Sequence, residues 1–146
     1  EAIQGQLRRI GVEATIQTLE WGAYLQETQR PLRENRIQMA MLGWGTVTGD
    51  ADYGLYPLFH SSQWAPGFNR AFYKNVEVDK LLAQARISTL PQGRQQLYRE
   101  AMIRIFRDAP WLFLHSEVQV TAVRREVQGF LVHPTERYLA YKARFR

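Results

Sequence analysis

The chain has 146 residues, of which 45% are hydrophobic and 12% aromatic, enough for one core of ordinary domain size. Its formal charge of +5 permits contact with acidic partners, but the arginines are interleaved with acids, so we expect a mixed, solvated surface and no nucleic-acid partner. The lack of cysteine excludes disulfides, thiolate metal sites and a cysteine nucleophile, and no apolar stretch approaches the roughly 20 residues of a membrane-spanning helix.

The first part of the chain predicts two helices and two strands. Gly11 follows the first helical pattern as a C-terminal stop, Pro31 should kink or interrupt the second, and Gly43 bounds a short apolar run that is typical of a buried strand. In chain order these elements are a helix over residues 1–10, a strand over 12–18, a helix over 23–35 and a strand over 37–42.

The rest of the chain predicts three helices followed by three strands. Asn75 is a good N-cap residue, and Pro91 suits the first turn of the long helix that residues 108–110 end. The apolar faces of these two helices are formed by Val78, Leu81, Leu82 and Ala85, and by Leu97, Ala101 and Ile105. In chain order the elements are a loop over 43–51, a helix over 52–59, a loop to residue 75, the two helices, and strands over 111–114, 118–123 and 127–132.

No pattern in the sequence predicts a catalytic residue. The three histidines, His60, His115 and His133, lie outside any nucleophile-elbow pattern, and the Ser and Thr residues lack a local signature. A triad assembled from distant positions stays open at this point, but we interpret these histidines as ordinary loop and strand-end residues.

No pattern predicts a metal or a phosphate site either. The run Asp50-Ala51-Asp52-Tyr53-Gly54 resembles the start of a calcium loop, but its glycine falls one position early and Ser61 stands where a bidentate Glu is needed. We interpret Asp50 and Asp52 as residues that cap and charge the following helix. The glycines of the loop do not form a phosphate-binding pattern. We therefore expect no metal and no cofactor.

The loop "GWGTVTGDADY" over residues 43–53 is the candidate binding element. Its glycines let the backbone around Trp44 turn sharply and approach a bound molecule closely. A flat aromatic wall with a few converging polar groups is how small-molecule pockets are lined. The alternative is that Trp44 is a core residue at a strand end, and the sequence leaves both interpretations open.

Five blocks of the sequence resemble, in family order, the dipeptide/oligopeptide class of ABC-importer solute-binding proteins. Among the branches of that class, the glutathione- and dipeptide-binding members are most similar. The blocks are "LRRIGVEATIQTLEWGAYL", "GWGTVTGDADYGLYPLF", "NRAFYKNVEVDKLLAQAR", "LYREAMIRIFRDAPWLFL" and "VRREVQGFLVHP".

The resemblance implies an α/β fold, a periplasmic-binding-protein-like lobe with a mixed central sheet flanked by helices. Residues 1–146 would be the C-terminal lobe of a two-lobe protein, with the N-terminal lobe and a lipoprotein or secretion signal upstream. The implied function is capture of a peptide or peptide-like solute in an interlobe cleft on the periplasmic or extracellular face of the cytoplasmic membrane. The partners would be the N-terminal lobe and ABC permease subunits, with no catalysis. The alternatives are a ligand-sensing receptor component and a small stand-alone enzyme domain.

The resemblance also implies which residues line the cleft. In the family, the strand that ends in Gly-Trp delivers the following loop to the ligand. One departure is Val47, which stands where peptide-binding relatives often place an Asp that takes the α-amino group of the ligand, so the kind of peptide stays open. The expected ligand-binding residues are Trp44, Gly45, Thr46, Val47, Thr48, Asp50 and Trp21.

Overall fold

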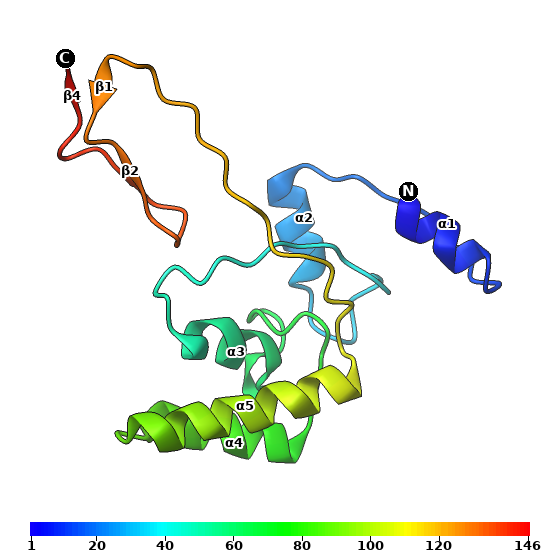
Figure 1. The fold of residues 1–146 in the computed structure, drawn as a ribbon. Coiled ribbons are helices and arrows are strands. Elements are labelled where there is room, and N and C mark those ends of the chain that lie inside the picture. The colour runs from blue at the N-terminus through cyan, green and yellow to red at the C-terminus, as the bar shows by residue number, and fades with distance from the viewer.

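The computed structural model describes residues 1–146 and is drawn in Figure 1. Helices α4 and α5 run side by side, α3 lies against them, and the C-terminal strands lie at the far end of a long extended segment. The elements are α1 (Ala2–Arg8), α2 (Trp21–Thr28), α3 (Ala51–Phe59), the 3-10 helix η1 (Ser61–Gln63), α4 (Val76–Ile87), α5 (Pro91–Asp108), β1 (Val127–Gln128), β2 (Leu131–Val132), β3 (Tyr138–Leu139) and β4 (Arg144–Phe145).

Capping residues determine where the helices begin and end. The Asp50 carboxylate accepts from the backbone N–H of Asp52 at the start of α3, and the Asn75 side chain accepts from two N–H groups at the start of α4. Helix α5 begins with Pro91 and ends at Ala109, whose φ of 48° is left-handed. The predictions for these three helices are confirmed, and so is the first helix, after which Gly11 has a φ of +80°.

Helix α2 differs from the prediction of a helix over 23–35. It begins at Trp21, because the Glu20 carboxylate accepts from the N–H groups of Gly22 and Ala23 and so acts as the N-cap. It ends at Thr28, before Pro31, which cannot continue a helical hydrogen-bond ladder. Pro31 therefore stops the helix.

The core lies between α3, α4 and α5. Leu82 and Ala85 of α4 are fully buried, and Ala101 of α5 meets them from the neighbouring helix. Small alanines on both helices let the two axes approach closely. The buried apolar side chains are Leu58, Phe59, Val78, Leu82, Ala85, Tyr98, Ala101 and Ile105, and they include every predicted apolar-face residue except Leu81 and Leu97, which pack against them half-buried.

The mixed central sheet is not formed within these residues. The pairings are two short antiparallel ones, β1 with β4 and β2 with β3. The segments 12–18, 37–42, 111–114 and 118–123, which were predicted as strands, form no strand and pair with none, and the prediction for 127–132 is divided into β1 and β2 by Gly129 at a φ of +73°. An alternating or continuous apolar pattern favours a strand whose apolar side chains are buried. The pattern does not provide the partner strand with which the backbone would form hydrogen bonds.

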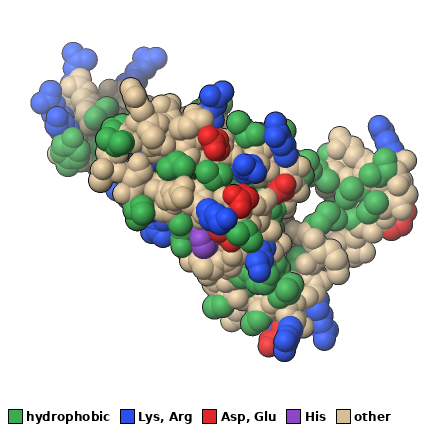
Figure 2. All heavy atoms as spheres, turned by 90° about the horizontal axis from the view of Figure 1, so that it is seen from below, with side chains coloured by type: hydrophobic (Ala, Val, Ile, Leu, Met, Phe, Trp, Pro, Cys, Tyr) green, Lys and Arg blue, Asp and Glu red, His purple; other side chains and the backbone are tan.

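Charges of both signs are intermixed on the surface. Figure 2 shows acidic and basic side chains next to one another over the face that lies at the bottom of Figure 1. Each of Lys80, Arg86 and Arg94 lies within ion-pair distance of a carboxylate. None of the helices is both long enough and apolar enough to cross a bilayer.

The substitution Leu82→Ala tests the core. It should lower the free energy of unfolding by about 2–5 kcal/mol, because the Leu82 side chain is fully buried and its removal leaves a cavity between α4 and α5. Urea unfolding monitored by helical circular dichroism measures this. The control Ile87→Ala lies on the same helix at 80% exposure and should change stability by no more than about 0.5 kcal/mol. Equal losses in the two variants would contradict the position of the core.

Candidate functional site

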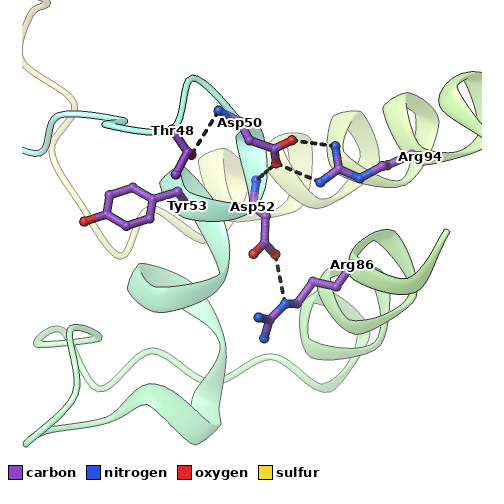
Figure 3. A pocket seen from close by; sticks show the side chains of 6 residues that line it. All are labelled: Thr48, Asp50, Asp52, Tyr53, Arg86 and Arg94. Carbon is purple, nitrogen blue, oxygen red and sulfur yellow. Dashed lines mark hydrogen bonds and ion pairs between the residues drawn. The ribbon is translucent and has the colours of Figure 1, made fainter. Parts of the chain in front are cut away.

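The loop that follows Gly43 ends at a polar hollow beside the N-terminus of α3. The hollow has a volume of about 340 Å³. Figure 3 shows that its side chains come from the loop and α3 on one side and from α4 and α5 on the other. The lining residues are Thr48, Asp50, Asp52, Tyr53, Arg86 and Arg94.

A bidentate ion pair joins Asp50 to Arg94. The two Nη atoms of Arg94 lie 2.7 and 3.0 Å from the two carboxylate oxygens of Asp50. Through these hydrogen bonds, Arg94 holds the pKa of the Asp50 carboxyl below its ordinary value, and the backbone N–H of Asp52 adds to the effect. Nε of Arg94 donates to the carbonyl of Ala85, one of the last carbonyls of α4. One guanidinium thus connects α3, α4 and α5.

A second pair joins Asp52 to Arg86. Nε of Arg86 lies 3.1 Å from an Asp52 carboxylate oxygen, and the guanidinium lies 4.0 Å from the centre of the Tyr56 ring. The Tyr98 hydroxyl donates to the same carboxylate, and burial, reinforced by the negative charge of Asp52, raises the pKa of Tyr98. The charges of the hollow are therefore paired within the chain.

Trp44 packs behind this charged network. Its ring stacks on Tyr53 at 5.4 Å between centroids and meets the edge of Phe68 at 5.2 Å. Its Nε1–H donates to the backbone carbonyl of Tyr53 at 3.1 Å. That carbonyl is free because Pro57, four residues later, has no N–H to donate to it. Trp44 is therefore half-buried, anchored to α3 and packed against the core.

The remainder of the loop approaches α3 and the C-terminal region closely. Gly49 has a φ of +69°, a conformation that side-chain-bearing residues rarely adopt. A Cβ added to Gly54 of α3 would lie 2.9 Å from Cγ2 of Thr46, and one added to Gly45 would lie 3.3 Å from a carboxylate oxygen of Glu136. The loop thus contacts both α3 and the turn that joins β2 to β3, although these loop residues stay exposed.

The structure brings most of the expected site residues together. Thr48 and Asp50 line the hollow, and the Thr48 hydroxyl accepts from the Asp50 N–H at 3.2 Å. Val47 is 38% exposed beside them.

Trp21 lies at the start of α2 instead, 58% exposed and stacked on Tyr24 rather than on Trp44. Tyr24 connects that helix to the segment before the loop, because its hydroxyl donates to the carbonyl of Met41.

His60 lies in a cluster that resembles a catalytic triad in composition only. Its Nδ1 accepts from the N–H of Ser62 and lies 2.8 Å from the Ser62 hydroxyl, contacts that cap η1. Asp79 approaches the same Nδ1 at 3.9 Å, whereas a triad requires base and acid on opposite ring nitrogens. The Asp79 carboxylate instead accepts two hydrogen bonds from Ser61. The cluster thus joins η1 to α4. No three His, Asp or Glu side chains of the chain converge to hold a metal ion.

Sequence reasoning missed the basic residues of the site, Arg86 and Arg94. Arg94 lies in the first turn of α5, where a positive charge is unfavourable toward the helix dipole. An arginine in the first turn of a helix is stabilised by an acidic side chain from another part of the chain. The position of Arg94 was therefore the signal in the sequence that could have pointed to such a partner. The partner, Asp50, is 44 positions away in the sequence and was interpreted as a cap and as a ligand-binding residue, not as the partner of an arginine.

Comparison with known proteins shows which proteins this chain is similar to. Residues 1–66 match the model described as "Bacterial extracellular solute-binding proteins, family 5 Middle". The glutathione-binding protein GsiB of Pectobacterium atrosepticum is 38% identical over 133 residues, which are 90% of this chain and 26% of that protein. GsiB of Escherichia coli is 36% identical over the same shares. The chain thus spans about a quarter of the length of these curated relatives.

Solved structures agree with the sequence matches. The oligopeptide-binding protein AppA of Bacillus subtilis, in complex with a nonapeptide, matches with a TM-score of 0.84 and 29% identity over 99% of this chain and 28% of that chain. The periplasmic binding protein DppA of Helicobacter pylori, in complex with the peptide STSA, matches with a TM-score of 0.66 and 36% identity over 74% and 21%. The predicted resemblance and the predicted fold class, an α/β lobe of the periplasmic-binding-protein type, are confirmed, although the central sheet is not assembled here.

The Asp50–Arg94 pair should give stability a defined pH dependence. Because the folded-state pKa of Asp50 is depressed, its contribution is fully present above the ordinary value of 3.8 and is lost as the pH falls through the lower folded-state pKa. Asp50→Asn keeps a capping side chain but removes the charge. After discounting for solvent screening of a carboxylate that is 43% exposed, the loss at pH 7 should be about 1 kcal/mol.

Urea unfolding at pH 7, 4 and 2 measures this loss, and the difference between wild type and Asp50→Asn should shrink toward pH 2. Asp50→Ala removes the cap as well and should cost about 1 kcal/mol more at every pH. A difference between wild type and Asp50→Asn that does not change with pH would contradict the ion pair.

The contact between Thr46 and Gly54 should appear as energetic coupling. In an otherwise free helix interior, Gly→Ala gains about 0.5–1 kcal/mol. Gly54→Ala should forfeit that gain, because its Cβ meets the Thr46 methyl group. In a Thr46→Ser background, which lacks the methyl group, the gain should return. A double-mutant cycle by urea unfolding should give a coupling of about 1 kcal/mol, and additive effects would place the loop away from α3.

Proposed function

We propose that this chain is the C-terminal lobe of a two-lobe substrate-binding component of an ABC importer. The protein would capture a peptide or peptide-like small solute in the cleft between its lobes and deliver it to permease subunits in the membrane. The observation that carries the proposal is the structural match to the nonapeptide-bound AppA, which extends over nearly the whole chain. The glutathione-binding relatives support a peptide-like solute as the ligand.

Unpaired apolar segments support the assignment to one lobe of a larger protein. Val118 and Val120 are 87% and 88% exposed, and Met39 and Met41 are 62% and 69% exposed. Side chains of this kind gain free energy when a partner covers them, and extended backbone gains hydrogen bonds when a strand pairs with it. Strands from the rest of the protein would provide both and complete the central sheet.

The ligand would be held without covalent chemistry. Trp44 would present the exposed part of its ring as an aromatic wall, with Gly45, Thr46, Val47 and Thr48 beside it and Trp21 at the edge. The Asp50 carboxylate is fully engaged by Arg94 and by the N–H of Asp52, so we assign Asp50 the role of holding the loop in place. Closure of the two lobes would exclude water and supply most of the affinity.

This role places the protein on the outer side of the cytoplasmic membrane, in the periplasm or attached to the membrane surface. The relatives are named for binding rather than for catalysis, which supports a protein without enzymatic activity. The paired charges of the hollow agree with that assignment, because a general acid or base needs a group that is free to exchange a proton.

Calorimetric titration of the full-length protein with peptides and with glutathione tests the proposal, and Trp44→Ala tests the wall. The variant should bind about 1–3 kcal/mol more weakly, because the ligand loses a large apolar contact. Trp44→Phe is the matched control, since it keeps a ring on Tyr53 while it loses the Nε1 hydrogen bond. A large fall in melting temperature with unchanged affinity in Trp44→Ala would show that Trp44 is a packing residue alone.

A further inference from the structure

Arg70 is held on a rigid part of the loop between η1 and α4. The preceding residue, Asn69, is fully buried, and its side-chain amide donates to the carbonyls of His60 and Tyr73 while its oxygen accepts from the Tyr73 N–H. The Trp64 indole also donates to the Tyr73 carbonyl at 2.8 Å. Both ends of the loop are therefore fixed, and the backbone of Arg70 is fixed with them.

The Arg70 side chain has buried donors without acceptors. Its Nε and Nη1 atoms are inaccessible to solvent and have no hydrogen-bond partner. The only interaction recorded for its guanidinium is with the Tyr24 ring, whose centre lies 5.9 Å away. A buried donor on a charged group loses the hydrogen bonds of water and gains nothing in return. An anionic acceptor at this position would remove that cost.

Arg70 is also connected through neighbouring residues to the two tryptophans that were predicted to contact the ligand. On one side, Tyr24 stacks on Trp21 at 5.6 Å and bonds to Met41. On the other side, Phe68, two residues before Arg70, packs against Trp44. A single chain of contacts thus runs from Trp21 through the Tyr24–Arg70 pair to the loop that carries Trp44.

We propose that Arg70 is a specificity residue that binds a carboxylate of the solute, since it contacts the neighbour of Trp21 and lies two residues from the neighbour of Trp44. The inference rests on the proposed function and deepens it, because it assigns the ligand class as an anionic peptide or peptide-like molecule. The guanidinium of Arg70 is fit for this task since it is permanently charged, two of its nitrogens are shielded from solvent without an acceptor, and it forms no ion pair with an acid of the chain. Arg86 and Arg94, by contrast, are each paired with an aspartate.

The test compares ligands that differ only in charge. The full-length protein is titrated with the peptide STSA bearing a free carboxyl terminus and with the same peptide as its C-terminal amide, and then with glutathione and its diethyl ester. Wild type should prefer the free acid of at least one pair by about tenfold to a hundredfold, the range of a hydrogen bond to a charged group. In Arg70→Gln that preference should disappear, mainly through weaker binding of the acid.

Two further variants separate recognition from folding. Arg70→Lys keeps the charge and should retain part of the preference, and Arg99→Gln removes an exposed arginine of α5 and should leave the preference unchanged. A wild type that binds the acid and its neutral derivative equally overturns the inference whether or not any variant folds. An unchanged preference in Arg70→Gln overturns it as well, and leaves the proposed function intact. Failure of wild type to bind any of the four ligands contradicts the proposed function, and the inference with it.

Discussion

The Asp50–Arg94 ion pair is the polar contact that joins all three core helices. Asp50 caps α3, and Arg94 lies in the first turn of α5 and bonds a C-terminal carbonyl of α4. The pair therefore joins three helix ends in addition to the apolar packing between the helices. Arg94 places a positive charge at the N-terminal, positive end of the α5 dipole, which is unfavourable. The Asp50 carboxylate neutralises that charge. The loop over residues 43–49 enters the fold at this junction.

A missing hydrogen bond in α3 gives that loop its second anchor. Pro57 interrupts the helical ladder, which leaves the Tyr53 carbonyl without a donor from the helix. The indole N–H of Trp44 takes that carbonyl, and the same ring stacks on the Tyr53 side chain. A proline that weakens the helix thereby orients the aromatic residue of the loop. The alternatives of core and cleft for Trp44 are consequently not exclusive, since one edge of the ring is committed to α3 while the ring as a whole stays half-buried.

Elements with local causes could be predicted from the sequence, and elements with remote partners could not. The ends of α3, α4 and α5 follow from Asp50, Asn75 and Pro91, residues that act within three positions of themselves. The segments 37–42 and 118–123 were predicted as strands from apolar patterns, yet a strand exists only with a neighbour, which no local pattern supplies. The site divides in the same way. Its loop was predicted from Trp44 and its glycines, whereas the contacts of Arg94 and Arg70 are with residues far away in the chain.

The arginines near the loop differ in whether their N–H groups already have acceptors within the chain. We assign a structural role to the arginines that have acceptors and a ligand-binding role to the one that does not. Every nitrogen of the Arg94 guanidinium has an acceptor within the chain, and Arg86 has both a carboxylate and an aromatic ring. These guanidinium groups would contribute little free energy to the binding of a ligand, because contact with the ligand would require an existing ion pair to break. Arg70 has no pair to break. Of the three arginines, Arg70 is therefore the one whose guanidinium could bind an anion without the loss of an ion pair within the chain.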